Sequence, residues 1–178
     1  MIEWKKLREE YLEIIRQWRM REDITRGMYT DPFITPEEQQ QWYKQISDDP
    51  TQMYWVTVYD GEPIGLVSLS SINQTHKSCQ TGGYIAEERG FAAVIANEYG
   101  LLKVAFDVLG MNRVQAEVLS NNMRIVKMHE LEGYTTEGVL RQAIFKQGMY
   151  YDIYIQSMLR EEWLAGKMRY QSDVVIEL

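Results

Sequence analysis

The order of strands and helices in the middle of the chain sets the strongest limit on its fold. The segment MYWVTVYDGEPIGLVSLSSI holds two β-rich runs separated by Asp60-Gly61-Glu62, a strong hairpin signal. The segment CQTGGYIAEE indicates a third strand, and from Ala92 to Leu109 apolar residues keep helical spacing for about five turns. The strand RVQAEVLS follows. Hairpins, then a strand, a long helix and another strand predict a mixed α/β layer with one central crossover.

The flanking segments complete this prediction. Residues 2–5 indicate a short opening strand, and residues 8–19 have the apolar spacing of an amphipathic helix. Thr35 is the expected N-cap of a second helix, with Pro36 at the first helical position and Glu38 completing a capping box. The residues between the two helices indicate a loop.

After the strand RVQAEVLS, a short helix closed by Gly133 is expected. Two further strands turn around Gln147-Gly148. Residues 1–160 are expected to form one domain, followed by a charged helical tail over residues 161–178.

Composition excludes several classes of function. The chain has 178 residues, a formal net charge of −7 and a pI near 5.0, which argue against a nucleic-acid binder. No segment approaches the length of a membrane span and the amino terminus lacks a signal-peptide core, so we expect a cytoplasmic protein without membrane contact. Cys79 is the single cysteine, and with only His76 and His129 beside it no metal site is expected.

The stretch EERGFAAVIANEYG, residues 87–100, carries an arginine and a glycine directly into the long helix. A strand that precedes such a helix places the amino terminus of the helix at the carboxyl edge of the sheet, where anions commonly bind. The alternative is a buried helix start with Arg89 in solvent. Ala92 and Val94 occupy positions where glycine would allow a closer approach of a phosphate.

These residues resemble the GNAT superfamily of acetyl-CoA dependent N-acetyltransferases, in particular the branch that modifies ribosomal-protein amino termini and small amines. The pyrophosphate motif of that family falls on residues 89–94, where Arg89 matches and Ala92 and Val94 depart. A second signature falls on Asn122, on His129 in place of a tyrosine, and on Gly133-Tyr134. The similarity covers residues 14–159 and implies a single domain with a mixed, mainly antiparallel central sheet and helices on both faces.

A closer similarity is to the GNAT enzymes of pseudaminic-acid synthesis, which acetylate the 4-amino group of a UDP-linked 4-amino-4,6-dideoxy sugar. The matching segments lie in the same order along the chain: Trp18-Arg19, Met28-Tyr29-Thr30 with Ile34, residues 116–122, Glu137-Gly138 and Leu140. An amino-terminal protein or small-amine acetyltransferase is the alternative within the family. A non-catalytic acyl-CoA-binding module is the alternative from another class.

The resemblance implies acetyl-CoA as cosubstrate and an amine as its partner, and it leaves a homodimer open. A strand over residues 83–86 would bind the pantetheine arm. The implied cofactor-binding residues are Ile85, Ala86, Arg89, Gly90, Phe91, Ala92, Ala93, Val94, Asn122 and Lys127. Arg124 is the alternative to Lys127, and a solvated face is the alternative for both.

Two residues are expected to move protons. By the resemblance, His129 stands where the family has a tyrosine and would protonate the coenzyme thiolate; about a quarter of an unperturbed histidine is protonated at pH 7. The alternative is a histidine that only packs beside Met128. Glu117, on the strand before Asn122, would take the proton of the amine through water, or is an ordinary charged strand residue.

The acceptor is expected to contact aromatic, methionine and arginine side chains, since rings stack on a uracil or cover a sugar and an arginine pairs with phosphate. The candidates are Arg19, Met28, Tyr29, Trp42, Tyr84 and Tyr151. The alternative for the tryptophan is that it only anchors its helix in the core.

Overall fold

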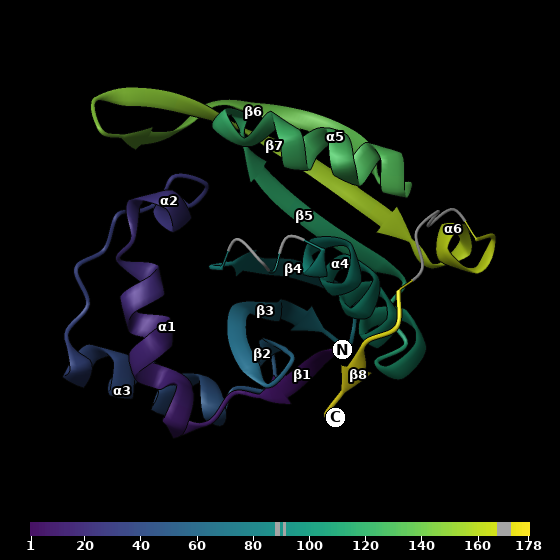
Figure 1. The fold of residues 1–178 in the computed structure, drawn as a ribbon. Helices are drawn as coiled ribbons and strands as arrows, with labels where there is room; N and C mark the ends of the chain where they lie inside the picture. Colours follow the sequence, from purple (N-terminus) through teal and green to yellow (C-terminus); the bar gives the residue numbers. More distant parts are fainter. Residues whose placement is uncertain (88–89, 91, 167–171) are drawn as a thin grey trace.

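The computed structural model describes residues 1–87, 90, 92–166 and 172–178, and they form one mixed sheet with helices on both faces (Figure 1). The strand order is β6-β7-β5-β4-β3-β2-β1-β8. The strands are β1 (Ile2–Lys6), β2 (Met53–Tyr59), β3 (Glu62–Asn73), β4 (Ser78–Ile85), β5 (Arg113–Leu119), β6 (Thr135–Lys146), β7 (Met149–Leu159) and β8 (Val175–Ile176). The helices are α1 (Leu12–Arg19), α2 (Glu22–Thr25), α3 (Pro36–Ser47), α4 (Ala93–Lys103), α5 (Met123–Glu132) and α6 (Arg160–Leu164).

The two predicted hairpins are confirmed, together with the reason for each turn. Asp60 and Gly61 have φ angles of 50° and 85°, and Gln147 and Gly148 have φ angles of 51° and 76°. Two central residues with positive φ give the turn whose twist matches that of antiparallel strands. β2 pairs with β3, and β6 with β7, in antiparallel register.

The crossover strands β4 and β5 are parallel and separate soon after they meet. Their register runs only from Ser78 opposite Arg113 to Gln80 opposite Gln115. Beyond this point β4 continues beside β3 alone, with Ile85 opposite Gly65, and β5 continues beside β7 (Figure 1). The sheet is therefore split on one side, and the backbone of β4 that faces the split has no strand partner among the described residues.

Alternate residues of β2 point into two different cores. Trp55 packs with Leu101, Phe106 and the rest of the α4 side, whereas the next residue, Val56, packs with Ile15 and the rest of the α1 side. This alternation is the period-two pattern of a strand buried on both faces. It confirms that helices cover both faces of the sheet.

Helix ends follow the predicted signals. Thr35 accepts a hydrogen bond from the Glu38 amide and the Glu38 carboxylate accepts one from the Thr35 amide, which is the predicted capping box. Gly133 ends α5 with a φ of 110°. α4 passes into a π-helical turn over Val104–Val108. Among the described residues no helix combines the length and apolarity of a transmembrane segment.

Two expectations about local structure are corrected. The predicted loop between the first two helices contains the short helix α2, because its apolar Ile24 is buried against the α1 side of the sheet. Of the described residues in the predicted helical tail, only those of α6 are helical, and the end of the tail forms β8, parallel to β1. There the carbonyl of Glu177 accepts a hydrogen bond from the Trp55 indole at 2.9 Å, so the tail covers an otherwise open sheet edge.

A glycine lets β3 and β4 approach closely at the split. A Cβ atom at Gly65 would lie 2.3 Å from the backbone oxygen of Tyr84, which cannot move without displacing β4. We predict that Gly65→Ala lowers the free energy of unfolding by about 1–3 kcal/mol, the usual cost of overpacking. Gly138→Ala is the control, since a Cβ there meets nothing within 4 Å. Urea unfolding of both variants measures the difference, and equal stabilities would contradict the prediction.

Candidate active site

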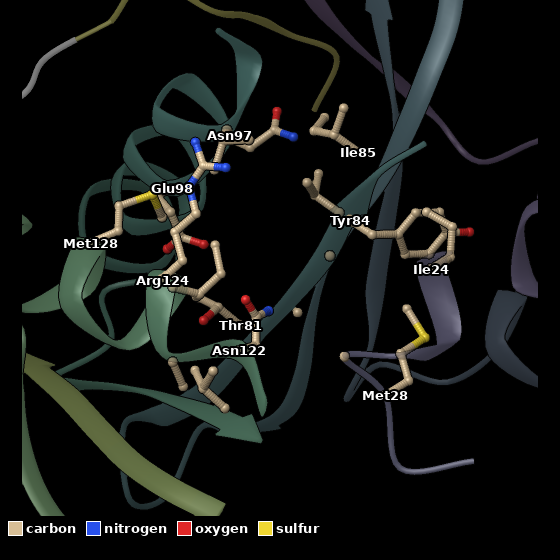
Figure 2. A pocket seen from close by; sticks show the side chains of 18 of the residues that line it. Ile24, Met28, Thr81, Tyr84, Ile85, Asn97, Glu98, Asn122, Arg124 and Met128 are labelled. Atoms are coloured by element: carbon tan, nitrogen blue, oxygen red, sulfur yellow. The ribbon is translucent and has the colours of Figure 1, made fainter. Parts of the chain in front are cut away.

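The split between β4 and β5 opens into a cavity of about 570 Å³. Its walls come from β4, β5, α4, α5 and the segment around α2. Figure 2 shows Glu98 and Arg124 on one side of this cavity, and Tyr84 and Met28 on the other. Elements far apart in the sequence therefore meet where the described strands β4 and β5 separate.

The amino terminus of α4 has the features of an anion site. Its N-cap, Ala92, provides no side-chain hydrogen bond, and the first turn contains no acidic residue. A helix start of this kind, with no acidic side chain in its first turn, favours an anion near its amides. Val94 lines the cavity, as do Ile85 and Ala86 of the predicted pantetheine strand.

The remaining residues of the predicted phosphate stretch have different positions. Gly90 is buried, and a Cβ atom there would lie 2.8 Å from side-chain atoms of Ile64 and Ile85. Ala93 is 1% exposed and belongs to the core rather than to the cavity wall. Arg89 and Phe91 lie outside the described residues, so their predicted roles stay predictions.

One face of α5 lines the cavity, and the basic residue on that face is Arg124 rather than the predicted Lys127. Asn122, Arg124 and His129 line the cavity, whereas Lys127 is exposed and does not. At about 100° per residue, Lys127 is rotated about 60° from Arg124, toward solvent. Arg124, the alternative in the sequence analysis, is thus the basic residue that α5 brings to the site.

His129 is a buried cavity residue with a fixed tautomer. Gln156 donates to the Val126 carbonyl at 3.0 Å and to the Thr136 hydroxyl at 3.1 Å, so its oxygen is the atom that faces His129 Nδ1 at 2.9 Å. Nδ1 is therefore the donor in this pair, and Nε2 is the nitrogen that titrates. Nε2 has no hydrogen-bond partner among the described residues and lies 3.6 Å from Glu98 Oε1.

Glu132 lies beside His129 and is completely buried. In the part of the chain that the structure describes, neither of its carboxylate oxygens has a hydrogen-bond partner, and its exposure is 0%. Burial, reinforced by the charge of Glu98, raises the pKa of Glu132 to about 8. One donor atom each from Glu98, His129 and Glu132 lie within 4.8 Å of one another.

The candidate base Glu117 is held by two hydrogen bonds. Tyr29 donates its hydroxyl to Glu117 Oε2, and Gln115 donates to Oε1 at 3.1 Å. Burial and the neighbouring Glu117 raise the pKa of Tyr29, so it remains a phenol that donates. Glu117 lines the cavity with its orientation set from both sides.

A second cavity of about 400 Å³ lies next to the first and contains four of the six predicted acceptor residues, Arg19, Met28, Trp42 and Tyr84. Met28 and Tyr84 line both cavities. The Tyr84 hydroxyl is buried and has no hydrogen-bond partner.

The other two predicted acceptor residues lie elsewhere. Tyr29 is bonded to Glu117 at the first cavity. Tyr151 lines neither cavity: it lies on β7 near Met149, because the β6–β7 hairpin extends past the site. Its predicted role in binding is therefore not supported by its position.

A buried lysine ties the β6–β7 hairpin to the loop that carries Met28 and Tyr29. Lys146 Nζ donates to the carbonyl of Thr25 and, at 3.0 Å, to that of Met28, and it lies 3.0 Å from an Asp31 carboxylate oxygen. The loop is thereby fixed above the first cavity. Nothing in the sequence pairs a hairpin lysine with a loop more than a hundred residues earlier.

Sequence reasoning also missed two polar residues of α4, Asn97 and Glu98, which line the cavity. A signal was present: with Val94 and Leu101 they form one face of the helix at helical spacing, and polar residues on an otherwise apolar face suggest a site. Cys79, in contrast, is buried in the α4-side core, and burial raises the pKa of its thiol to about 12, which is unsuited to a nucleophile.

The family is decided by a match of residues 4–135 to the acetyltransferase (GNAT) domain. The chain belongs to the GNAT acetyltransferases. This GNAT domain is similar to the acetyltransferase PseH of Campylobacter jejuni, with 29% identity over 72% of this chain and 80% of the relative. It is also similar to the spermidine N(1)-acetyltransferase of Vibrio cholerae, with 27% identity over 86% of this chain and 90% of the relative.

A solved structure of a relative has the same fold. The crystal structure of the Vibrio cholerae spermidine N-acetyltransferase in complex with CoA and spermine superposes on this GNAT chain with a TM-score of 0.87 and 24% identity, over 92% of this chain and 98% of the other. The predicted fold and class of enzyme are confirmed, and the protein is an N-acetyltransferase of the GNAT type.

The buried Glu132 gives a pH dependence of stability. Its pKa is 4.5 in its ordinary state and about 8 in the folded protein, so between these values the folded state binds more protons and stability falls as pH rises. We predict that Glu132→Gln flattens this fall, by up to about 1.4 kcal/mol per pH unit. The measurement is the free energy of unfolding in urea at several pH values between 5 and 8. The control is Glu130→Gln, since Glu130 is exposed. Parallel curves for all three proteins would refute the prediction.

Proposed function

We propose that this GNAT enzyme transfers acetyl from acetyl-CoA to the primary amine of a nucleotide-linked amino-deoxysugar, at the 4-amino position. The observation that carries the choice of acceptor is the wall of the second cavity, which combines three aromatic rings with the arginine Arg19. The first cavity would take the coenzyme, and the two share Met28 and Tyr84. Acetyl group and amine would meet where the cavities join.

The first cavity suits acetyl-CoA in shape and chemistry. Among the described strands, none pairs with the split side of β4 from Thr81 to Ile85, so the outward backbone groups there would be available to bond a pantetheine arm. The uncapped first turn of α4 suits a pyrophosphate, and Arg124 brings positive charge to the same wall. The amide near Ile85 would polarise the thioester carbonyl.

Acetyl transfer needs a base for the amine and an acid for the leaving thiolate. Glu117, oriented by Tyr29 and Gln115, would take the amine proton through water as nitrogen bonds to the carbonyl carbon. The carbon–sulfur bond then breaks, and His129 would give its Nε2 proton to the sulfur. A direct attack of this kind uses no covalent enzyme intermediate, which agrees with the burial of Cys79.

The second cavity favours a neutral or anionic acceptor with a flat ring. Trp42 and Tyr54 meet edge to face with ring centroids 5.3 Å apart. Among the described residues the buried Tyr84 hydroxyl has no hydrogen-bond partner. The acid in this wall, Glu38, already caps α3. Arg19 would repel a polycation and attract a phosphate. These properties suit a nucleotide sugar better than a polyamine.

A polyamine or another small amine is the second candidate. The first cavity has carboxylates in its wall, Asp23, Glu87, Glu98 and Glu117, which would attract a cationic amine. The similarity to spermidine acetyltransferases supports this alternative.

The acceptor is tested by measuring coenzyme A release from purified protein with acetyl-CoA and one amine at a time. A UDP-linked 4-amino-4,6-dideoxy sugar should give turnover, whereas spermidine and an amino-terminal peptide should not. Turnover with spermidine or the peptide alone would overturn the proposed acceptor. Tight acetyl-CoA binding with no release for any amine would mean a binding module.

His129→Phe tests the acid. Phenylalanine keeps an aromatic ring at this position but has no proton to donate. We therefore predict a fall in kcat of about 10²–10⁴, the usual contribution of proton transfer. The measurement is coenzyme A release, with circular dichroism to check folding. The control is His76→Phe, since His76 is exposed and outside both cavities. An unchanged kcat for His129→Phe would show that the histidine only packs.

Trp42→Ala tests the acceptor cavity. Loss of the indole should raise KM for the amine about tenfold or more, since stacking on a base contributes about 1–3 kcal/mol. KM for acetyl-CoA should be unchanged. Tyr43→Ala, one position further along α3 and outside the cavity wall, is the matched control. An equal rise in both KM values would remove Trp42 from the acceptor site.

A further inference from the structure

A cluster of buried titratable groups surrounds His129 and is larger than a single acid requires. Glu98 faces it from α4, Glu132 lies on α5 with it, Tyr134 stacks on its ring at 4.7 Å, and Gln156 faces it from β7. His129 is 3% exposed and Glu132 is 0% exposed. Charges inside such a cluster act on one another strongly because little water screens them.

The hydrogen bonds of the cluster leave one nitrogen uncommitted. Gln156 occupies Nδ1, and the Tyr134 hydroxyl donates to Glu98 Oε2 at 3.2 Å. The other oxygen of Glu98 faces Nε2 at 3.6 Å, too far for a hydrogen bond but close enough for a strong charge interaction. Nε2 can therefore carry a proton that no atom of the described residues holds by a hydrogen bond, and both His129 and Glu98 line the cavity.

Charge balance decides how many protons the cluster holds. Two carboxylates this close in a buried place cannot both stay ionised without a cation, and one of them takes a proton. Burial and Glu98 raise the pKa of Glu132, which makes Glu132 the protonated member. Burial alone would lower the pKa of His129, but Glu98, Gln156 and Glu132 together raise it. One carboxylate, one carboxylic acid and one imidazolium then form a neutral cluster.

We propose that Glu98 and Glu132 are positioning residues for the acid His129: the partly buried carboxyl group of Glu98 and the buried one of Glu132 share one negative charge, which keeps a proton on Nε2 until the coenzyme thiolate takes it. In that step the Nε2–H bond breaks, a sulfur–hydrogen bond forms, and the imidazolium becomes neutral imidazole. The cavity, which Glu98 lines, gives the cluster access to a new proton once the thiol has left. This inference rests on the proposed role of His129 as acid.

The first test observes the proton on His129 directly and needs no coenzyme. In the His76→Phe background His129 is the single histidine, so NMR titration of its ring follows one group. Glu98→Gln should lower the midpoint of this titration by about one pH unit or more, since an adjacent opposite charge has an effect of that size. Glu132→Gln should lower it less, and the double variant most. Glu130→Gln, an exposed carboxylate on the same helix, should leave it unchanged.

The second test measures kcat as a function of pH for the same variants. The alkaline limb of each variant's kcat–pH profile should move to lower pH, in the same order as the NMR midpoints. Near pH 6 the kcat of each variant should approach that of the unaltered enzyme. A merely structural role would lower kcat at every pH without moving the limb. Folding of each variant is checked by thermal unfolding, and Glu132→Gln, uncharged and of equal size, serves if Glu98→Gln is unstable.

The two tests separate this inference from the proposed function. Midpoints that do not differ between the Glu98 and Glu132 variants and the control would overturn the inference. Midpoints that move while the kcat profile does not would show that the cluster holds the proton but His129 is not the acid, and the proposed mechanism would fail instead.

Discussion

β4 and β5 share parallel pairing at only three residue pairs, and the site depends on that short contact. While the strands are paired, side chains such as Cys79 fill the core beneath them. Where they separate, the backbone of β4 from Thr81 onward faces a cavity. The same separation leaves room for α4 and one face of α5 to line that cavity, so the first turn of α4, Glu117 and His129 lie around one space.

Close packing of backbones keeps the split in position. Gly65 and Gly83 allow β3 and β4 to approach to distances that a Cβ would prevent, 2.3 and 2.8 Å from backbone oxygens of the neighbouring strand. β4 is thus held firmly on one side while it is open on the other. Lys146 adds a second constraint, because its ammonium fixes the loop of Met28 and Tyr29 over the cavity.

Electrostatics inside the site follow from the same architecture. α4 and α5 pack so that Glu98 and His129 meet, and Glu132, which precedes the glycine that ends α5, is turned inward with them. Exposed, these residues would titrate independently. Buried together, they share protons, and that sharing connects the packing of two helices to the proposed chemistry of acetyl transfer.

Local rules made much of the fold readable from the sequence. The capping box at Thr35 and Glu38, the turn at Asp60-Gly61 and the glycine that ends α5 each depend on neighbouring residues, and each was predicted correctly. The family signatures likewise indicated Asn122 and His129, which line the cavity. β8 could not be predicted in this way, because a two-residue strand forms only when a distant edge is present to pair with it.

What the sequence determined by itself was most of the series of elements, the crossover and, through the family resemblance, the class of enzyme, since hydrophobic periodicity, turn chemistry and local motifs depend on contiguous residues. Tertiary structure alone decided which side chains meet. It placed Arg124 rather than Lys127 at the cavity through the rotation of α5, left Tyr151 outside both cavities, and placed Glu98 against His129. The physical reason is that contacts between residues far apart in the chain, and the burial that shifts their protons, exist only once the sheet and helices have packed.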